Sequence, residues 1–310
     1  MEKNDFLENI LSRKQGKYYD IAVMYSGGKD SSFLLYLLKE VYKLRVIACF
    51  VDNGFENNCV WENIENFTKK MDVPLKIIKT QKDDFNKTFN TLIVNYELFK
   101  REKTNHICFI CNNFLWANVV KFAGENDIPY VASGLSLMQL SSGRPYPLEP
   151  NKLANSIAEK STKQILKNSI SGFKKSDNYN KDYQFKCFID KMSNIEKNVT
   201  TVYPYIYHQI SVNDLKNKIA ALGWKSPNNV ELNKYISSGC SIMKYVIPEL
   251  EKMGIITLNE RNQAKVMMKK GLLDKSQLKF AIYDATHDVV DLSHPLFDEL
   301  DVREFLMSLK

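Results

Sequence analysis

The sequence predicts an α/β protein with a doubly wound parallel sheet and a mostly helical C-terminal part. Short buried apolar runs alternate with longer helical stretches from about Tyr19 to Gly134. Small and polar residues directly follow several of these runs. The last third of the chain instead carries the Lys/Leu periodicity of helices. Strands that alternate with helices are typical of a parallel sheet with helices packed against it.

The elements follow in chain order. A strand is expected over Asp20–Tyr25 and a helix over Phe33–Lys39, because each run has the apolar pattern of its type. The same reasoning gives the remaining elements of the first part of the chain: strand Arg45–Val51, helix Val60–Met71, strand Val73–Ile78, a helical region Asp84–Arg101, a helix from near Cys111 to Ala123, and strand Ile128–Ala132.

The chain changes character beyond this region. Residues 143 to 200 are rich in Lys, Asn and Ser, and are expected to be helical with a mobile loop around Lys174–Lys181. Order is expected to return at Thr201–Ile206, followed by a helix over Asp214–Leu222 that Gly223 ends. We therefore expect a nucleotide-binding α/β core over residues 1–142, an insertion over 143–200, and a segment over 201–310 that completes the core.

Composition limits the class of protein. A chain of 310 residues with 44% hydrophobic content can bury a large core. It has no run of 18 apolar residues, and its N-terminus lacks the apolar region of a signal peptide, so we expect a cytoplasmic protein with no membrane span. The net charge of +7 permits an anionic partner such as tRNA. It is equally common in Lys- and Asn-rich proteomes, and the chain has no dense Arg cluster.

The stretch Ser26–Ser32, with the sequence SGGKDSS, is the most informative part of the chain. It lies between the first predicted strand and the first predicted helix. Glycines let a ligand approach the backbone, and the free N–H groups at a helix start favour anions. Serine hydroxyls and the charge of Lys29 add to this preference, so we expect a phosphate site. The glycine spacing is not that of the Walker loop.

This stretch resembles the PP-loop, SGGxDS, of the ATP pyrophosphatase superfamily, and it matches every fixed position. The resemblance implies a PP-loop fold, ATP as cosubstrate, and transfer of AMP to a substrate oxygen with release of pyrophosphate. It implies that Lys29 faces the phosphates and that Asp30 is a partner of Mg²⁺. The strand ends add further residues near the nucleotide, and we expect the following set to bind it: Tyr25, Ser26, Gly27, Gly28, Lys29, Asp30, Ser31, Ser32, Asp52, Ser133 and Gly134. Asp52 can equally be an ordinary turn residue at the end of a strand.

Six cysteines are too few for a disulfide scaffold, so a close pair is better suited to metal binding or catalysis. Cys108 and Cys111 form a C-x-x-C at the start of a predicted helix, although two buried free thiols would give the same pattern. Cys240 lies in a loop of small residues and is a candidate third ligand. Cys187 is the fallback third ligand, and Cys49 is expected in the core.

Two paired cysteines and one remote cysteine resemble the PP-loop tRNA thiolases. The resemblance implies that Cys108, Cys111 and Cys240 hold a [4Fe–4S] cluster with one open iron, and that Cys108 and Cys111 take part in catalysis. Zinc on three thiolates is the competing metal. The chain departs from the thiolases at residues 135–139, where LSLMQ stands in place of a His-x-x-Asp-Asp run. This departure favours a small-molecule or carrier-bound substrate over tRNA.

Two downstream stretches, Leu222–Pro227 and Met267–Leu278, are similar to the N-acetyl sugar amidotransferases. Two functions therefore stay open. One is an ATP-dependent sulfurtransferase that adenylates a carbonyl or amide oxygen and receives sulfur from sulfide or a donor protein. The other is an amidotransferase subunit with structural zinc, which takes ammonia from a partner glutaminase. The sequence leaves the oligomeric state open, a homodimer included. A nucleotide-sensing or RNA-binding module is a third, non-enzymatic interpretation. A reductase of adenylated sulfate is disfavoured, because residues 241–310 contain no cysteine.

Overall fold

Five parallel strands in the order β3-β2-β1-β4-β5 form the centre of the protein. The computed structural model of the chain describes residues 3–13, 15–99, 105–135, 160–194, 199–225, 239–257, 260–274 and 292–309. The strands are β1 (Ile21–Met24), β2 (Val46–Asp52), β3 (Leu75–Lys79), β4 (Tyr130–Ala132) and β5 (Thr200–Val202). The parallel sheet expected from the sequence is confirmed.

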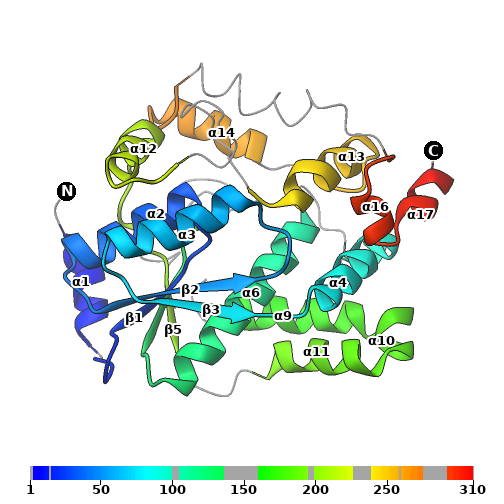
Figure 1. Cartoon of the computed structure of the whole chain (residues 1–310), viewed down its shortest axis with the longest axis horizontal. Helices are drawn as coiled ribbons and strands as arrows, with labels where there is room; N and C mark the ends of the chain where they lie inside the picture. The colour runs from blue at the N-terminus through cyan, green and yellow to red at the C-terminus, as the bar shows by residue number, and fades with distance from the viewer. Residues whose placement is uncertain are drawn as a thin grey trace.

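The sheet has a hydrophobic core on each face. Successive side chains of β1 alternate between them: Ile21 and Val23 pack into one core and Ala22 into the other. Helices α2 and α3 lie on one face, and α6 and α9 lie on the opposite face (Figure 1). Strands buried on both faces explain the continuous apolar runs of the sequence.

The direction in which strands are added reverses between β1 and β4. Strands β2 and β3 extend the sheet on one side of β1, and β4 and β5 extend it on the other. A reversal of this kind leaves a crevice beyond the carboxyl ends of the two strands, where ligands bind in open α/β sheets. The loop that follows β1 lies at this crevice.

The helices supply the layers on both sides of the sheet. In chain order they are α1 (Asp5–Ser12), α2 (Lys29–Tyr36), the π-helical turn η1 (Leu37–Val41), α3 (Asn58–Lys70), α4 (Lys82–Val94), α5 (Tyr96–Phe99), α6 (His106–Glu125), α9 (Lys160–Phe173), α10 (Asp177–Lys181), α11 (Tyr183–Ser193), the 3₁₀ turn η2 (Pro204–Ile206), α12 (Val212–Ala221), the π-helical turn η3 (Ile242–Val246), α13 (Ile247–Lys252), α14 (Glu260–Lys269), α16 (Leu296–Glu299) and α17 (Arg303–Ser308).

Two expectations from the sequence are wrong in detail. Helix α6 begins at His106 rather than near Cys111, because the Asn105 side chain accepts the N–H of Cys108 and caps the helix earlier. The stretch around Lys174–Lys181 is not a mobile loop. Ser176 caps α10 there by accepting the N–H of Tyr179, and α10 packs against α11.

Helix α6 is long and apolar enough to cross a membrane by length and composition, but 56% of its most apolar window is buried inside the protein. Several sequence features lie outside the described residues. These are Arg144–Pro147 and Ser237–Ser238. They also include residues 136–139, 226–227 and 275–278, which end the three stretches that were compared with known families.

Candidate active site

The loop between β1 and α2 has the geometry of an anion site. Gly28 is the N-cap of α2 and offers no side-chain oxygen to the first N–H groups of the helix. The backbone alone therefore presents these N–H groups, next to the positive end of the helix dipole. This arrangement suits a phosphate.

The two glycines of the loop have different roles. Gly27 has φ of +67°, and a Cβ there would lie 3.0 Å from the Val60 carbonyl oxygen and from Ile64 Cγ1. Gly28 has φ of −76° and ψ of 166°, an extended conformation open to any residue. The positive φ of the loop is therefore at Gly27, where α3 approaches the loop.

Serine hydroxyls brace the loop from inside. Ser31 Oγ lies 3.1 Å from Ser26 Oγ, accepts the Ser26 N–H at 3.2 Å and donates to the Gly28 carbonyl at 3.2 Å. Tyr25 and Ser32 are buried, and the Tyr25 hydroxyl donates to the Asn63 carbonyl and lies 3.4 Å from Ser32 Oγ. Tyr25 and Ser32 thus help to set the loop conformation from within the core.

Lys29 and Asp30 form the charged part of the loop. Lys29 Nζ donates to Asp30 Oδ2 at 2.5 Å. The Lys29 side chain is 10% exposed, whereas the Asp30 side chain is 44% exposed. The carboxylate is therefore accessible to a cation from solvent, and the ammonium is held beside the helix start.

A cavity of about 190 Å³ opens at the carboxyl ends of β1, β2 and β4. Its lining includes four loop residues, Tyr25, Ser26, Asp30 and Ser31, and the end of β4 at Ser133 and Gly134. A Cβ on Gly134 would lie 3.5 Å from the Asp30 carbonyl carbon and the Ser31 nitrogen, so β4 ends directly against the loop. The sequence-predicted residues from β1 and β4 thus meet at one cavity.

Asp52 closes a turn and does not lie at this cavity. Its Oδ1 accepts the Gly54 N–H at 3.0 Å, which closes the turn after β2, and Asp52 does not line the cavity. Glu56, four residues later, does line it. Burial, with a further effect of the Asp52 charge, raises the pKa of Glu56 to about 7.

The two cysteines of the C-x-x-C lie in the first turns of α6. Cys111 is buried and receives a hydrogen bond from Asn53 Nδ2 at 3.8 Å. Burial raises its pKa to about 12, although the Asn53 contact acts in the opposite direction. Cys108 is half-buried, and its Sγ lies 3.1 Å from Met243 Sδ.

The loop that carries Cys240 is joined to the segment after β2. Glu56 and Cys240 form an antiparallel bridge, in which the Asn57 N–H donates to the Gly239 carbonyl at 3.0 Å and the Ser241 N–H donates to the Phe55 carbonyl at 2.8 Å. A Cβ at Gly239 would lie 2.0 Å from Val60 Cγ2, so only glycine permits this approach. Burial, followed by the charges of Glu56 and Cys111, raises the pKa of Cys240.

The three cysteines therefore gather around one segment. Cys240 lies within electrostatic reach of Cys111. Cys108 contacts Met243, which lies on η3, shortly after Cys240 in the sequence. Three thiols suit a soft metal or an iron–sulfur cluster, so the donor set fits either group. Among the described residues, no three His, Cys, Asp or Glu side chains lie close enough to share a metal ion in the conformation observed.

Residues 205–224 contact the phosphate loop from outside, although the sequence did not indicate that they do so. The Tyr205 hydroxyl donates to the Asp30 carbonyl at 2.5 Å, and Trp224 Nε1 donates to the Gly27 carbonyl at 2.8 Å. Between them in sequence, Lys216 on α12 is 1% exposed. Its spacing of four residues from Val212 and three from Ile219 places it on the apolar face of the helix, and this spacing is the signal that could have revealed it.

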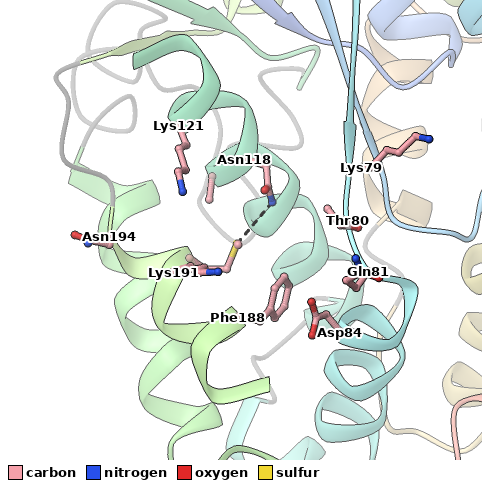
Figure 2. A pocket seen from close by; sticks show the side chains of 11 residues that line it. Lys79, Thr80, Gln81, Asp84, Asn118, Lys121, Phe188, Lys191 and Asn194 are labelled. Carbon is pink, nitrogen blue, oxygen red and sulfur yellow. Dashed lines mark hydrogen bonds between the residues drawn. The ribbon is translucent and has the colours of Figure 1, made fainter. Parts of the chain in front are cut away.

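A second cavity, of about 220 Å³, lies away from the loop, between the end of β3, α6 and α11. Figure 2 shows Lys121 on α6 and Lys191 on α11 across from Thr80 and Gln81, and Asn118 Nδ2 donates to Met192 Sδ at 3.7 Å. Its lining residues are Lys79, Thr80, Gln81, Asp84, Ala117, Asn118, Lys121, Phe188, Lys191, Met192 and Asn194. None of them belongs to the loop or the cysteines, so the smaller cavity is the candidate active site.

Comparisons with known proteins agree with the loop geometry. Residues 20–114 match the model of the phosphoadenosine phosphosulfate reductase domain family. An uncharacterized protein of Methanocaldococcus jannaschii is 37% identical over 83 residues, which cover 27% of this chain and 29% of that protein. A protein of the same organism named as a probable sulfurtransferase is 31% identical over 125 residues, which cover 38% of this chain and 36% of the relative. The chain thus matches about a third of the length of these relatives.

Two solved structures are more distant. The U34-tRNA thiolase NcsA from Methanococcus maripaludis, with its [4Fe-4S] cluster, aligns with 91% of this chain and 78% of its own, at 14% identity and a TM-score of 0.40. The NH3-dependent NAD synthetase from Campylobacter jejuni aligns with 63% of this chain and 90% of its own, at 16% identity and a TM-score of 0.32. At these scores neither likeness extends to individual residues.

The SGGKDSS loop, the parallel sheet on which it stands and the match over residues 20–114 agree with one another. Residues 20–114 therefore form a PP-loop domain similar to the phosphoadenosine phosphosulfate reductase domain family.

Proposed function

We propose that this protein is an ATP-dependent sulfurtransferase. It adenylates a carbonyl or amide oxygen of its substrate, releases pyrophosphate, and exchanges that oxygen for sulfur. One observation carries the proposal: the phosphate loop lines the same cavity as Glu56, the residue that is bridged to the segment with Cys240. Ser26 and Asp30 line this cavity, and so does Glu56, which is bridged to Cys240.

The first half of the reaction follows from the loop. The substrate oxygen attacks the α-phosphorus of ATP, and the bond to the β-phosphate breaks with its electron pair on pyrophosphate. The N–H groups at the start of α2 and the Lys29 ammonium hold the phosphates and offset this charge. Asp30, with its accessible carboxylate, would hold Mg²⁺, which would offset negative charge on the phosphates.

The second half requires a sulfur nucleophile. Sulfur attacks the adenylated carbon, and AMP leaves with the original substrate oxygen. Cys108, Cys111 and Cys240 would hold a [4Fe–4S] cluster, which when bound supplies an activated sulfur atom. The buried position of Cys111 limits the access of water to this chemistry. The relative named as a probable sulfurtransferase supports sulfur over ammonia.

The proposed substrate is a small or carrier-bound molecule rather than tRNA, and a sulfide source or donor protein supplies the sulfur. The absence of a His-x-x-Asp-Asp run at residues 135–139 supports this choice of substrate. The protein is proposed to act in the cytoplasm.

The test uses anaerobically purified protein, analysed for iron and zinc and supplied with ATP, sulfide and a pool of acceptors. We expect brown, iron-containing protein and a product heavier by the difference between sulfur and oxygen. Colourless zinc protein that forms product only with ammonia would instead establish the amidotransferase. The Asp30→Ala variant is the control for dependence on the loop.

A further inference from the structure

Lys216 is a buried lysine on the helix that covers the phosphate loop. Its side chain is 1% exposed and lies on the face of α12 that also carries Val212, Leu215 and Ile219. Lysines at such positions usually extend their ammonium group to water. Lys218, on the same helix, is exposed and lies over the Tyr36 ring at 4.7 Å. The buried position of Lys216 is therefore specific to that residue.

Helix α12, which carries Lys216, packs against α2, which carries Lys29 and Asp30. The pKa of Lys216 is lowered to about 8, first by burial and then by the charge of Lys29, while Asp30 acts in the opposite direction. Lys216 and Lys29 thus lie on two helices that pack against each other, and the dipole at the start of α2 is also positive. Such a concentration of positive charge is offset when a multiply charged anion binds.

Two contacts, one before and one after Lys216 in the sequence, hold its segment against the loop. Tyr205, before it, donates to the Asp30 carbonyl, and Trp224, after it, donates to the Gly27 carbonyl. Helix α12 packs against α2 between these two contacts. The lysine is therefore held against the loop by the same segment that shapes the loop.

We propose that Lys216 is a second cationic ligand, with Lys29, of the β- and γ-phosphates of bound ATP. This inference rests on the proposed function, because it assigns a residue to the same nucleotide site. When the bond between the α- and β-phosphates breaks, its electron pair stays on the departing pyrophosphate. The Lys216 ammonium donates a hydrogen bond to that group and keeps its own proton.

The experiment compares ATP, inorganic pyrophosphate and AMP, because AMP lacks the β- and γ-phosphates. Their affinities for the full chain are measured by calorimetry in the presence of Mg²⁺. The variants are Lys216→Met and Lys216→Gln, so that one folded variant is available if the other does not fold. Lys218→Met is the matched control, since it removes the same charge from the exposed side of α12.

We expect both Lys216 variants to bind ATP and pyrophosphate more weakly, on the order of 10- to 100-fold, with AMP affinity unchanged. Lys218→Met should bind all three ligands like the unaltered protein. Equal losses for ATP and AMP, or a lower thermal midpoint with unchanged pyrophosphate affinity, would assign Lys216 a structural role and overturn the inference. If the unaltered protein binds neither ATP nor pyrophosphate, the proposed function fails instead.

Discussion

The indole nitrogen of Trp224 donates a 2.8 Å hydrogen bond to the carbonyl oxygen of Gly27, the loop residue with a positive φ. Trp224 is 3% exposed and lies almost two hundred residues further along the chain. The side-chain amide of Asn63 on α3 holds the next residue, because Nδ2 donates to the Lys225 carbonyl and Oδ1 accepts its N–H. The loop is thus shaped by a distant segment as well as by its own sequence.

Trp224→Phe should weaken the loop without altering its charges. The Gly27 carbonyl loses its donor, which costs about 1 kcal/mol in the free energy of unfolding. We expect pyrophosphate affinity to fall as well, as measured by calorimetry. Trp61→Phe is the control, because Trp61 packs edge-on against Phe50 with ring centroids 4.9 Å apart. If both variants lose the same affinity, the contact with Gly27 has no specific role.

Gly27→Val should abolish ATP-dependent pyrophosphate release in a protein that still folds. A β-branched residue at φ of +67° is strained, and its Cβ would lie 3.0 Å from the Val60 carbonyl. Gly28→Ala should have a smaller effect, since the backbone there is extended and the nearest atom is Ser26 Oγ at 3.3 Å. Full pyrophosphate release by a folded Gly27→Val variant would contradict the assignment of the loop.

His208 should make the protein less stable in acid. The Tyr42 hydroxyl accepts the Asn4 N–H and lies 2.5 Å from His208 Nε2. Burial, followed by the charge of the N-terminus, lowers the pKa of His208. A group with a lowered pKa binds fewer protons when folded, so stability is lost as the pH falls below the unfolded pKa of about 6.5.

The measurement for His208 is the free energy of unfolding in urea between pH 5 and pH 8. Each pKa unit of lowering corresponds to about 1.4 kcal/mol of stability lost in acid. His208→Gln should show a smaller loss over the same range, because it cannot take up the proton. Identical pH profiles for the two proteins would exclude His208 as the cause.

Removal of any proposed thiol ligand should release the metal. Alanine variants of Cys108, Cys111 and Cys240 should each lose most of the bound iron measured after anaerobic reconstitution. Cys59→Ala and Cys187→Ala are controls, because these cysteines lie on other helices: Cys59 in the first turn of α3 and Cys187 on α11. Loss of iron from Cys187→Ala together with its retention in Cys240→Ala would make Cys187 the third ligand.

The sequence by itself determined the local parts of this protein. The apolar runs specified the buried strands, and the glycines and serines of SGGKDSS specified the loop between β1 and α2, because these features depend on residues close in the chain. Strand ends also predicted that Ser133 and Gly134 approach the loop, since the carboxyl ends of parallel strands lie at one edge.

Other features depended on contacts between residues far apart in sequence, which only the tertiary structure decided. The bridge of Glu56 to Cys240 places a lone cysteine near Cys111, and it requires the close approach of Gly239 to Val60. Asp52 closes its own turn, whereas Glu56 lines the cavity, a difference that depends on the path of the chain after β2. Lys216 resembles a solvent-exposed lysine by residue type, and it is buried because α12 packs against α2. Burial and electrostatic contact arise from packing, so residue type alone could not place these groups at the site.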